Sequence, residues 1–221
     1  MVNMNKTKLA AVMDYETLHN YGVSAKAISC GMLAFDVNGN KNEIIDSNGH
    51  IIAPHFSHLI RHSDEDQPGR ISSAETIKWW SERPAEVRKR VFDENLTRLT
   101  VEEHLRAVRA FIKKYDIGEV WANSPRFDLN ILHTLWLDIF PDERFPISYK
   151  VERDVRSIEQ FIFGTAEMRY QGGILHYGEA HNELDDCVTE AFVIQAAHQF
   201  RNAAIEALGD PREFVLRNFI N

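Results

Sequence analysis

Two carboxylates two positions apart, Asp14 and Glu16, come directly after the apolar residues 9–13. In an extended strand successive side chains alternate between faces, so this pair stands on one face and Tyr15 on the other. Adjacent carboxylates repel one another unless a positive charge lies between them. A Lys or Arg side chain could supply that charge, and so could a metal ion. The pair therefore predicts either an ion pair or a metal site at the end of the first strand.

A metal site at that position requires further carboxylates, and Asp128 is the first candidate. It lies in the segment ANSPRFDLNIL, at the predicted start of a helix that follows a short buried strand. Ligand sites in α/β sheets collect beyond the strand ends. Mg²⁺ and Mn²⁺ prefer oxygen ligands, and two ions about 3.5–4 Å apart at a phosphate need bridging carboxylates. A helix-start Asp is also stabilised by the helix dipole, by roughly 0.3–1 kcal/mol, which is the structural interpretation of the same residue.

The segment HNELDDC supplies a histidine and two candidate aspartates. Asp185 shares a helix face with His181 if both residues are helical. Asp186 instead heads a mostly apolar row that continues through Glu190, Val193, Ala197 and Phe200. A carboxylate at the head of a buried row is costly unless it is paired or bound to a metal. This argument favours Asp186, and a solvated, capped helix start is the alternative interpretation of the segment.

The first part of the chain predicts three antiparallel strands that would position Asp14 and Glu16. Residues 8–15 and 27–36 are the first two, and the third lies within residues 50–60. The Asn-Gly pairs at 38–39 and 48–49 are strong hairpin-turn signals. We therefore expect a meander whose strands are joined by tight turns.

Helical signals then alternate with shorter strands. Pro84 divides residues 72–94 into two helices, with Ser72 or Ser73 as a cap, and Thr100 with Glu103 has the spacing of a capping box. Further predicted elements are a strand at 119–123, a helix from Pro125 to Leu137, a strand at 147–152, and helices at 153–163, about 182–208 and after Pro211. The order predicts an α/β fold with a mixed sheet, an antiparallel meander plus parallel strands, flanked by helices.

The composition is that of an ordinary globular protein of one domain. The 221 residues carry a formal net charge of −8, which argues against broad, non-specific duplex binding but not against a small site in which metals supply the positive charge. Cys30 and Cys187 lie in apolar stretches and are expected to be buried free thiols in a reducing compartment. No apolar run approaches the roughly 20 residues of a membrane span, so we expect a cytoplasmic protein. The expected organisation is one domain over residues 1–221, with a short polar lead at 1–7 and a helical extension at about 209–221.

The ordered set D-x-E, then F-D at a helix start, then H-x-x-x-x-D resembles the DEDDh branch of the 3′-5′ exonuclease superfamily. This branch includes ribonuclease T, oligoribonuclease and polymerase proofreading domains. The chain is more similar still to the group that contains ribonuclease AS, the exodeoxyribonuclease VIII-like proteins and a phage exonuclease A. The residues that carry this likeness are TIKWW at 76–80, VWAN with FD and IL at 120–132, RDVR at 153–156 and HNELDD at 181–186. The resemblance spans about residues 11–197 and implies a ribonuclease H-like fold.

Carried over position by position, the resemblance implies a catalytic set of four acids and one histidine. Asp14 and Glu16 match the first family motif, Asp128 the second, and His181 with Asp186 the third; Asp185 falls outside that spacing. In two respects the chain departs from its relatives: Ser124-Pro125 stiffens a loop that tends to be small and flexible there, and the stretch 42–55 is longer.

The activity that the resemblance implies is metal-dependent removal of nucleoside 5′-monophosphates from the 3′ end of single-stranded RNA or DNA. Two Mg²⁺ or Mn²⁺ ions held by the four acids would bracket the scissile phosphate, and His181 would act as general base. The implied substrate-binding candidates are Thr17, Leu18, Trp79, Trp80, Asn123 and Phe127, with Tyr15 as a further stacking aromatic. For each Trp, core packing is an equally good interpretation. Asp154 and Arg156 are interpreted as a local ion pair or cap.

Three alternatives are kept. One is a catalytically weak nucleic-acid-binding protein on the same fold, and another is a phosphodiesterase for small nucleotides. The third concerns His55, His58 and His62, whose spacing suits a helical zinc site, although in the predicted strand His55 and His58 face opposite ways. The choice between RNA and DNA depends on contacts to the 2′-hydroxyl, which the sequence does not show. Relatives often form homodimers, so a homodimer is a possible partner state, and no membrane partner is expected.

Overall fold

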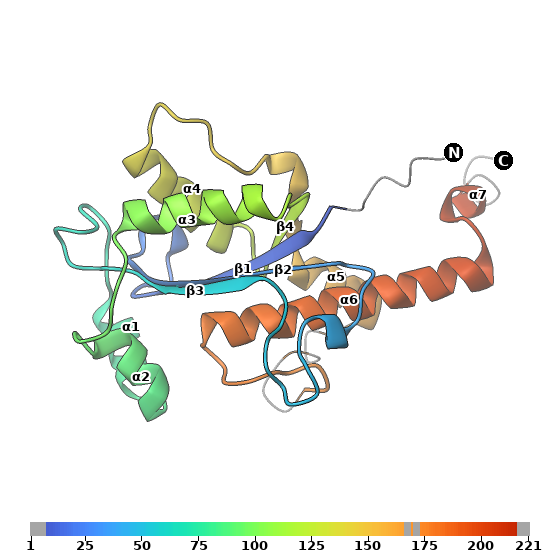
Figure 1. Ribbon diagram of the computed structural model, residues 1–221, viewed down its shortest axis with the longest axis horizontal. Helices are drawn as coiled ribbons and strands as arrows, with labels where there is room; N and C mark the ends of the chain where they lie inside the picture. The colour runs from blue at the N-terminus through green and yellow to red at the C-terminus, as the bar shows by residue number, and fades with distance from the viewer. Residues whose placement is uncertain (1–7, 166–168, 170–172, 216–221) are drawn as a thin grey trace.

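A five-stranded sheet runs through the middle of the molecule, with helices on both faces (Figure 1). The computed structural model describes residues 8–165, 169 and 173–215, so the predicted lead at 1–7 and the last residues of the extension, 216–221, lie outside the described part. The sheet order is β3-β2-β1-β4-β5, with β1–β2 and β2–β3 antiparallel and β1–β4 and β4–β5 parallel. The predicted α/β class and mixed sheet are confirmed. The strands are β1 (Ala10–Thr17), β2 (Ala27–Phe35), β3 (His55–Leu59), β4 (Glu119–Ala122) and β5 (Glu152–Asp154).

The helices form two layers and a separate pair. One face of the sheet is covered by α3 (Val101–Lys114) and α4 (Asp128–Ile139), the other by α5 (Val155–Phe163) and α6 (Glu183–Leu208). The pair α1 (Ala74–Ser81) and α2 (Ala85–Phe92) lies at one end of the molecule, and α7 (Pro211–Val215) lies beyond the far end of α6 (Figure 1). Within the described residues none of the helices has the length and apolar character of a membrane span.

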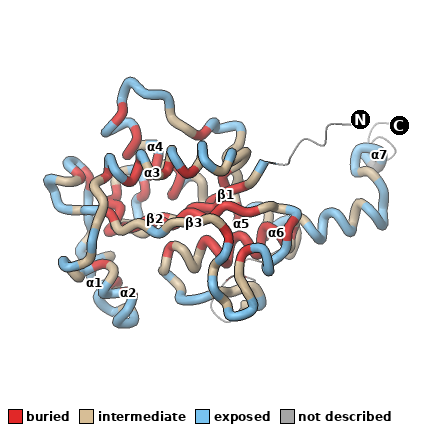
Figure 2. The backbone as a smooth tube through the Cα atoms, viewed as in Figure 1, coloured by how far each residue is buried: buried red, intermediate tan, exposed pale blue. Residues whose placement is uncertain are grey.

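Alternation along β1 decides which helices its side chains meet. Ala11 and Met13 belong to the core cluster under α3 and α4, whereas Ala10 and Val12 belong to the cluster under α6. The buried stretches of β1 and β2 form the centre of the molecule in Figure 2. The same alternation places Asp14 and Glu16 on the α6 face, because they continue the series of Ala10 and Val12.

Most helix boundaries follow from local signals. Pro84 separates α1 from α2, and Ser73 caps α1 by accepting a hydrogen bond from the backbone N–H of Thr76. The capping box of Thr100 and Glu103 is present at the start of α3. Each cap satisfies N–H groups that the first turn of a helix leaves without a partner.

The predicted tight turns between the first three strands are wrong. Residues 36–54 separate β2 from β3 and contain the short 3₁₀ helix η2 (Lys41–Glu43) and a bridge between Ile45 and Ile51. This connection buries Ile44 and Ala53 in the core cluster under α6, so it forms part of the hydrophobic core and is more than a turn. Asn48-Gly49 does form a turn, with Gly49 at φ 81°, but inside the connection.

Two further boundaries differ from prediction. The helix after β4 begins at Asp128 and not at Pro125, because the carbonyl of Ser124 accepts the N–H groups of both Phe127 and Asp128 in a preceding turn. The predicted strand at 147–152 is mainly the 3₁₀ helix η3 (Tyr149–Val151), capped by the side chain of Ser148. Only residues 152–154 pair with β4, as the short edge strand β5.

A single glycine allows α6 to begin directly on the sheet. Gly31 of β2 lies opposite Asp14 of β1, and a Cβ at Gly31 would lie 2.5 Å from the carbonyl oxygen of Glu183. Since any larger residue would displace the helix, this contact brings the first turns of α6 over the end of β1. The element that carries the HNELDD segment is thereby fixed beside Asp14.

Candidate active site

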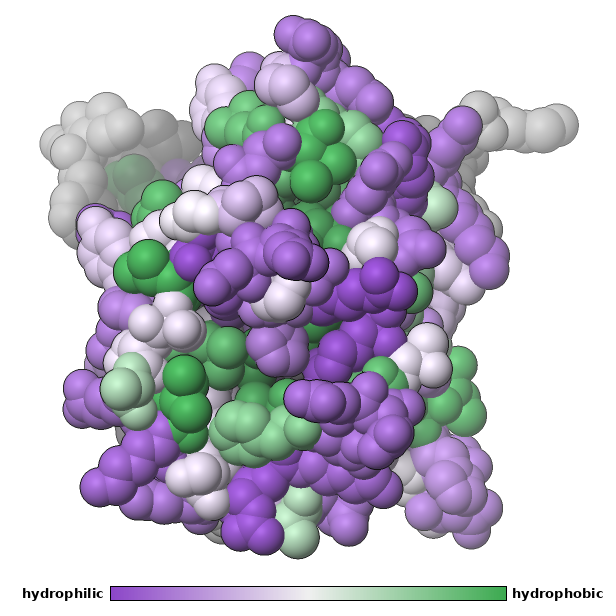
Figure 3. Space-filling view, turned by 90° about the vertical axis from the view of Figure 1, so that its left-hand side faces the viewer, coloured by the Kyte–Doolittle hydropathy of each residue, from purple (hydrophilic) through white to green (hydrophobic). Residues whose placement is uncertain are grey.

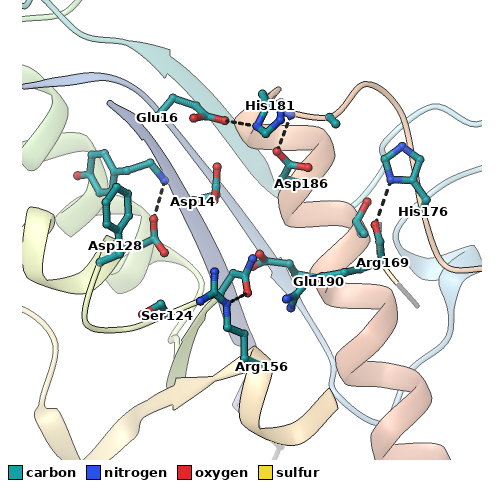
Figure 4. Close-up of a pocket in the computed structure, with 15 residues that line it drawn as sticks. Asp14, Glu16, Ser124, Asp128, Arg156, Arg169, His176, His181, Asp186 and Glu190 are labelled. Atoms are coloured by element: carbon teal, nitrogen blue, oxygen red, sulfur yellow. Dashed lines mark hydrogen bonds and ion pairs between the residues drawn. The ribbon is translucent and has the colours of Figure 1, made fainter. Parts of the chain in front are cut away.

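A cavity of about 530 Å³ opens where β1 ends, beside the starts of α4, α5 and α6 (Figure 4). Figure 3 views the side of the molecule at which β1 ends and α6 begins, where hydrophilic side chains surround smaller apolar areas. The cavity is predominantly lined by charged and polar residues. The lining residues are Asp14, Tyr15, Glu16, Asn123, Ser124, Phe127, Asp128, Arg156, Arg169, His176, Ala180, His181, Asp186, Thr189 and Glu190.

Five carboxylates from three elements line this cavity. Asp14 and Glu16 come from β1, Asp128 from the first turn of α4, and Asp186 and Glu190 from α6 (Figure 4). All four acids predicted from the sequence motifs are therefore brought together. The position of Asp128 is fixed by the backbone N–H of Tyr15, which donates to its Oδ1 at 3.0 Å. Because Tyr15 lies between Asp14 and Glu16, this hydrogen bond holds Asp128 of α4 beside the two acids of β1.

The carboxyl groups hold their protons more tightly than isolated acids do. Burial, and to a smaller degree repulsion between neighbouring carboxylates, raises the pKa of Asp14 and Glu16 well above the usual range. Burial likewise raises the pKa of Asp128 and of Asp186 to about 7. So many buried acids in one cavity are costly when ionised unless cations lie among them. An all-oxygen donor set of this kind fits Mg²⁺ or Mn²⁺.

His181 lies at the edge of the carboxylate cluster. Its backbone has φ 66°, and its N–H donates to Oδ2 of Asp186 at 2.9 Å. The imidazole Nδ1 is 3.9 Å from Oε1 of Glu16, and the ring lies edge-on to Trp79 at a centroid distance of 4.8 Å. Burial is the main reason that its pKa is lowered below 6.5, so the imidazole is neutral at pH 7. Ligand atoms of Glu16, His181 and Asp186 all lie within 4.8 Å of one another, close enough to hold a metal ion.

The two neighbouring aspartates of α6 have different surroundings. Asp186 lines the cavity, whereas Asp185 does not; its Oδ2 accepts the backbone N–H of Glu179 at 2.9 Å. Asp185 also packs against Gly178, where an added Cβ would lie 2.3 Å from the carboxylate. Asp185 therefore supports the loop before α6, and Asp186 is the aspartate that faces the other acids.

The predicted substrate-binding residues fall into two groups. Asn123 and Phe127 line the cavity, as does Tyr15. Thr17, Leu18 and Trp80 are buried outside it, and the indole N–H of Trp80 donates to the carbonyl of Thr17 at 2.8 Å. Trp79 does not line the cavity either; it lies between His181 and the guanidinium of Arg83, which is 4.3 Å from its ring centre. The two tryptophans therefore support β1 and His181 by packing.

Four ionisable cavity residues were not among the predicted site residues. Glu190, 2% exposed, was noted only as a member of the row that Asp186 heads, and its i+4 spacing from Asp186 was the available signal. Arg156 was interpreted as part of a local ion pair or cap; Asp154 does cap α5, but the side chain of Arg156 donates from Nε to Asn123 Oδ1 at 3.0 Å. Arg169 and His176 also line the cavity, and Arg169 forms an ion pair with Glu159 at 2.8 Å.

The histidines of the third strand form no metal site within the described residues, where the only metal-compatible group found is that of Glu16, His181 and Asp186. His58 turns toward His104, with 3.3 Å between their Nδ1 atoms, and stacks on Phe56. The alternative of a zinc site on His55, His58 and His62 is therefore not supported.

A buried ionic network holds the start of α6 beneath the site. The side chain of Glu183 is fully buried, accepts hydrogen bonds from Ser29 and Ser57, and is ion-paired with Arg90 of α2.

Removing one partner of such a pair leaves an uncompensated buried charge, which costs about 3 kcal/mol or more. Arg90→Ala should therefore lower the melting temperature clearly, whereas Arg88→Ala, an exposed arginine of the same helix, should change it little. Thermal unfolding at matched salt checks this, and equal melting temperatures for the two variants would contradict it.

The sheet order and the helices on both faces form a fold that solved exonuclease structures share. The nuclease domain of 3′hExo, a DEDDh family member bound to rAMP, aligns with a TM-score of 0.57 and 13% identity over 90% of this chain and 94% of that domain. E. coli exonuclease I in complex with a dA16 oligonucleotide aligns with a TM-score of 0.54 and 13% identity over 96% of this chain, which spans 44% of exonuclease I.

The chain belongs to the Rv2179c-like 3′-5′ exoribonuclease domain family, whose model matches residues 10–198. The matched range contains every cavity residue and all five strands. No curated protein matches the chain. The chain is therefore a hydrolase of the 3′-5′ exonuclease type.

Proposed function

We propose that this protein removes nucleoside 5′-monophosphates one at a time from the 3′ end of single-stranded RNA, using two divalent cations. The observation that carries the proposal is the convergence of Asp14, Glu16, Asp128 and Asp186 with His181 around one cavity. The family description supports RNA as the substrate. The net charge of −8 agrees with substrate contacts that are confined to the cavity.

The carboxylates are the residues that would hold the cations. Asp14 lies at the centre of the cluster, with Glu16 and Asp186 toward His181 and Asp128 on the opposite side (Figure 4). Two bound Mg²⁺ or Mn²⁺ ions lower the pKa of a water and stabilise the leaving oxygen in reactions of this kind. The raised carboxyl pKa values fit this role, because a bound cation favours the ionised form that burial disfavours.

The protein's own groups perform the proton transfer and the positioning. The neutral imidazole of His181 accepts a proton from the attacking water, which bonds to phosphorus while the bond from phosphorus to the 3′ oxygen breaks. Glu16 lies on the Nδ1 side of the ring, so its carboxylate stabilises the imidazolium as it forms. The edge contact with Trp79 keeps the ring in place. Phe127, at the cavity wall, offers a face for base stacking.

Metal dependence and product identity test this proposal together. The purified protein is incubated with matched single-stranded RNA and DNA in EDTA, Mg²⁺ or Mn²⁺, and the released nucleotides are separated by chromatography. We expect nucleoside 5′-monophosphates from RNA with either cation, none in EDTA, and slower release from DNA. Turnover in EDTA, or release of 3′-monophosphates, would contradict the two-cation mechanism. Hydrolysis of small nucleotide diesters without shortening of either polymer would identify the alternative, a small-nucleotide phosphodiesterase.

A further inference from the structure

Arg156 is an arginine of the cavity that the mechanism above does not use. It lines the cavity on the far side of Asp14 from Glu16 and His181, beside Ser124 (Figure 4). The side chain is exposed, and within the described residues it forms no ion pair. The other cavity arginine, Arg169, is buried and paired with Glu159. Arg156 therefore places a positive charge within electrostatic range of Asp128 and Glu190, without a direct ion pair to either.

The guanidinium is held in a fixed orientation by its neighbour. Its Nε donates to Oδ1 of Asn123 at 3.0 Å, while its backbone N–H is capped by Asp154. Within the described residues, the two terminal nitrogens of the guanidinium donate no hydrogen bond and are available to a ligand. Since the amide oxygen of Asn123 is also engaged, its NH₂ group remains as a further donor. Hydrogen-bond donors together with a positive charge make a site for an anion.

The sheet topology places this site in line with the acids. Asp14 and Glu16 end β1, Asn123 follows β4, and Arg156 follows β5, and these three strands are neighbours in the order β1-β4-β5. Ala122 and Asp154 are register partners, which keeps the ends of β4 and β5 level. A polynucleotide strand that crosses these strand ends therefore meets the acids first and Arg156 next.

We propose that Arg156, oriented by Asn123, binds the phosphate on the 5′ side of the scissile linkage. This inference rests on the proposed function, which places the scissile phosphate at the acids. The 3′-terminal nucleotide of a strand ending in a hydroxyl carries no phosphate other than the scissile one. A second phosphate in the cavity must therefore belong to the preceding linkage. A dinucleotide NpN lacks that group, whereas a 5′-phosphorylated dinucleotide, pNpN, has it.

The test compares kcat/KM for the ribodinucleotides NpN and pNpN in the presence of Mn²⁺. For the wild type we expect a preference for pNpN of roughly 10-fold or more, the size of a charge-assisted contact. In Arg156→Gln the preference should fall toward one, and Arg156→Lys should keep part of it. Arg153→Gln is the matched control, because Arg153 belongs to the same RDVR segment but pairs with Glu119 outside the cavity. Its preference should equal that of the wild type.

Three results would overturn the inference. One is a wild type with no preference for pNpN, and another is an Arg156→Gln variant that keeps the full preference. The third is an equal loss on both dinucleotides, which would place Arg156 on the scissile phosphate. If the wild type shortens no RNA at all, the proposed function fails, and binding alone tests the subsite. In a plot of log affinity for labelled RNA against log salt concentration, the slope should then be shallower by roughly 0.7 in Arg156→Gln than in the wild type. An unchanged slope would overturn the inference.

Discussion

Asp128→Asn is expected to lower kcat by about 100-fold or more and at the same time to make the metal-free protein more stable. Asparagine keeps the oxygen that accepts the N–H of Tyr15 but removes the negative charge. Mutation of a residue that only orients a metal ligand typically lowers metal affinity or activity by 10–100-fold. Loss of a charged ligand itself should therefore lower kcat by about 100-fold or more.

The gain in stability follows from the direction of the pKa shift. Burial raises the pKa of Asp128 from an ordinary 3.8 to about 7 in the folded protein. The folded state therefore binds the proton more tightly than the unfolded chain, and its stability falls as the pH rises from about 4 to about 7. Above that range the ionised Asp128 destabilises the metal-free wild type by an amount on the order of 4 kcal/mol. An amide in place of the carboxyl group removes it.

Thermal unfolding in EDTA at pH 5 and pH 8 measures this effect. The melting temperature of Asp128→Asn should exceed that of the wild type at pH 8, and the difference should be smaller at pH 5. Asp142→Asn is the control, because Asp142 is exposed and away from the cavity. A variant that turns over RNA normally, or that is less stable than the wild type at pH 8, would contradict the assigned role of Asp128.

His181→Asn should lower kcat by about 10²–10⁴-fold, the usual contribution of a general base, while metal binding is retained. Asparagine suits this position because His181 has φ 66°, a conformation that Asn tolerates better than most residues. Its backbone N–H can still donate to Asp186, so the loop before α6 should keep its shape. The loss should therefore be one of chemistry and not of folding.

Two measurements separate a base from a metal ligand, since His181 lies within reach of both Glu16 and Asp186. One is kcat at saturating Mn²⁺, and the other is the rise in melting temperature that Mn²⁺ produces. His181→Asn should retain that rise, whereas Asp186→Asn should lose most of it. If His181→Asn lost the rise as well, the histidine would be a ligand; wild-type kcat would exclude both roles.

Local patterns predicted the parts of the fold that depend on neighbouring residues. The capping box at Thr100, the break at Pro84 and the alternation of Asp14 and Glu16 each depend on contacts within a few residues, and the structure confirms them. The choice of Asp186 over Asp185 used helical periodicity, and only Asp186 lines the cavity. Periodicity carries this information because it decides which side of a helix faces the core.

The rest depends on contacts between distant segments. Arg156 meets Asn123 only because β4 and β5 are level at their ends, and Glu183 finds Arg90 across 93 positions of sequence. The approach of α6 to β2 requires glycine at position 31, which in sequence is one glycine within an apolar strand. The prediction of tight turns was wrong for a similar reason. Residues 36–54 bury Ile44 in a core that other elements form, and a local turn signal carries no information about that contact.

A time course with 5′-labelled single-stranded RNA tests the central claim most directly. Wild-type protein and Asp186→Asn are each incubated with the RNA and Mn²⁺, and the labelled fragments are resolved at single-nucleotide resolution. The proposed function predicts a ladder that shortens from the 3′ end with the wild type and intact RNA with the variant. Intact RNA with both proteins, or the same ladder with both, would contradict the assignment of this cavity as the exonuclease site.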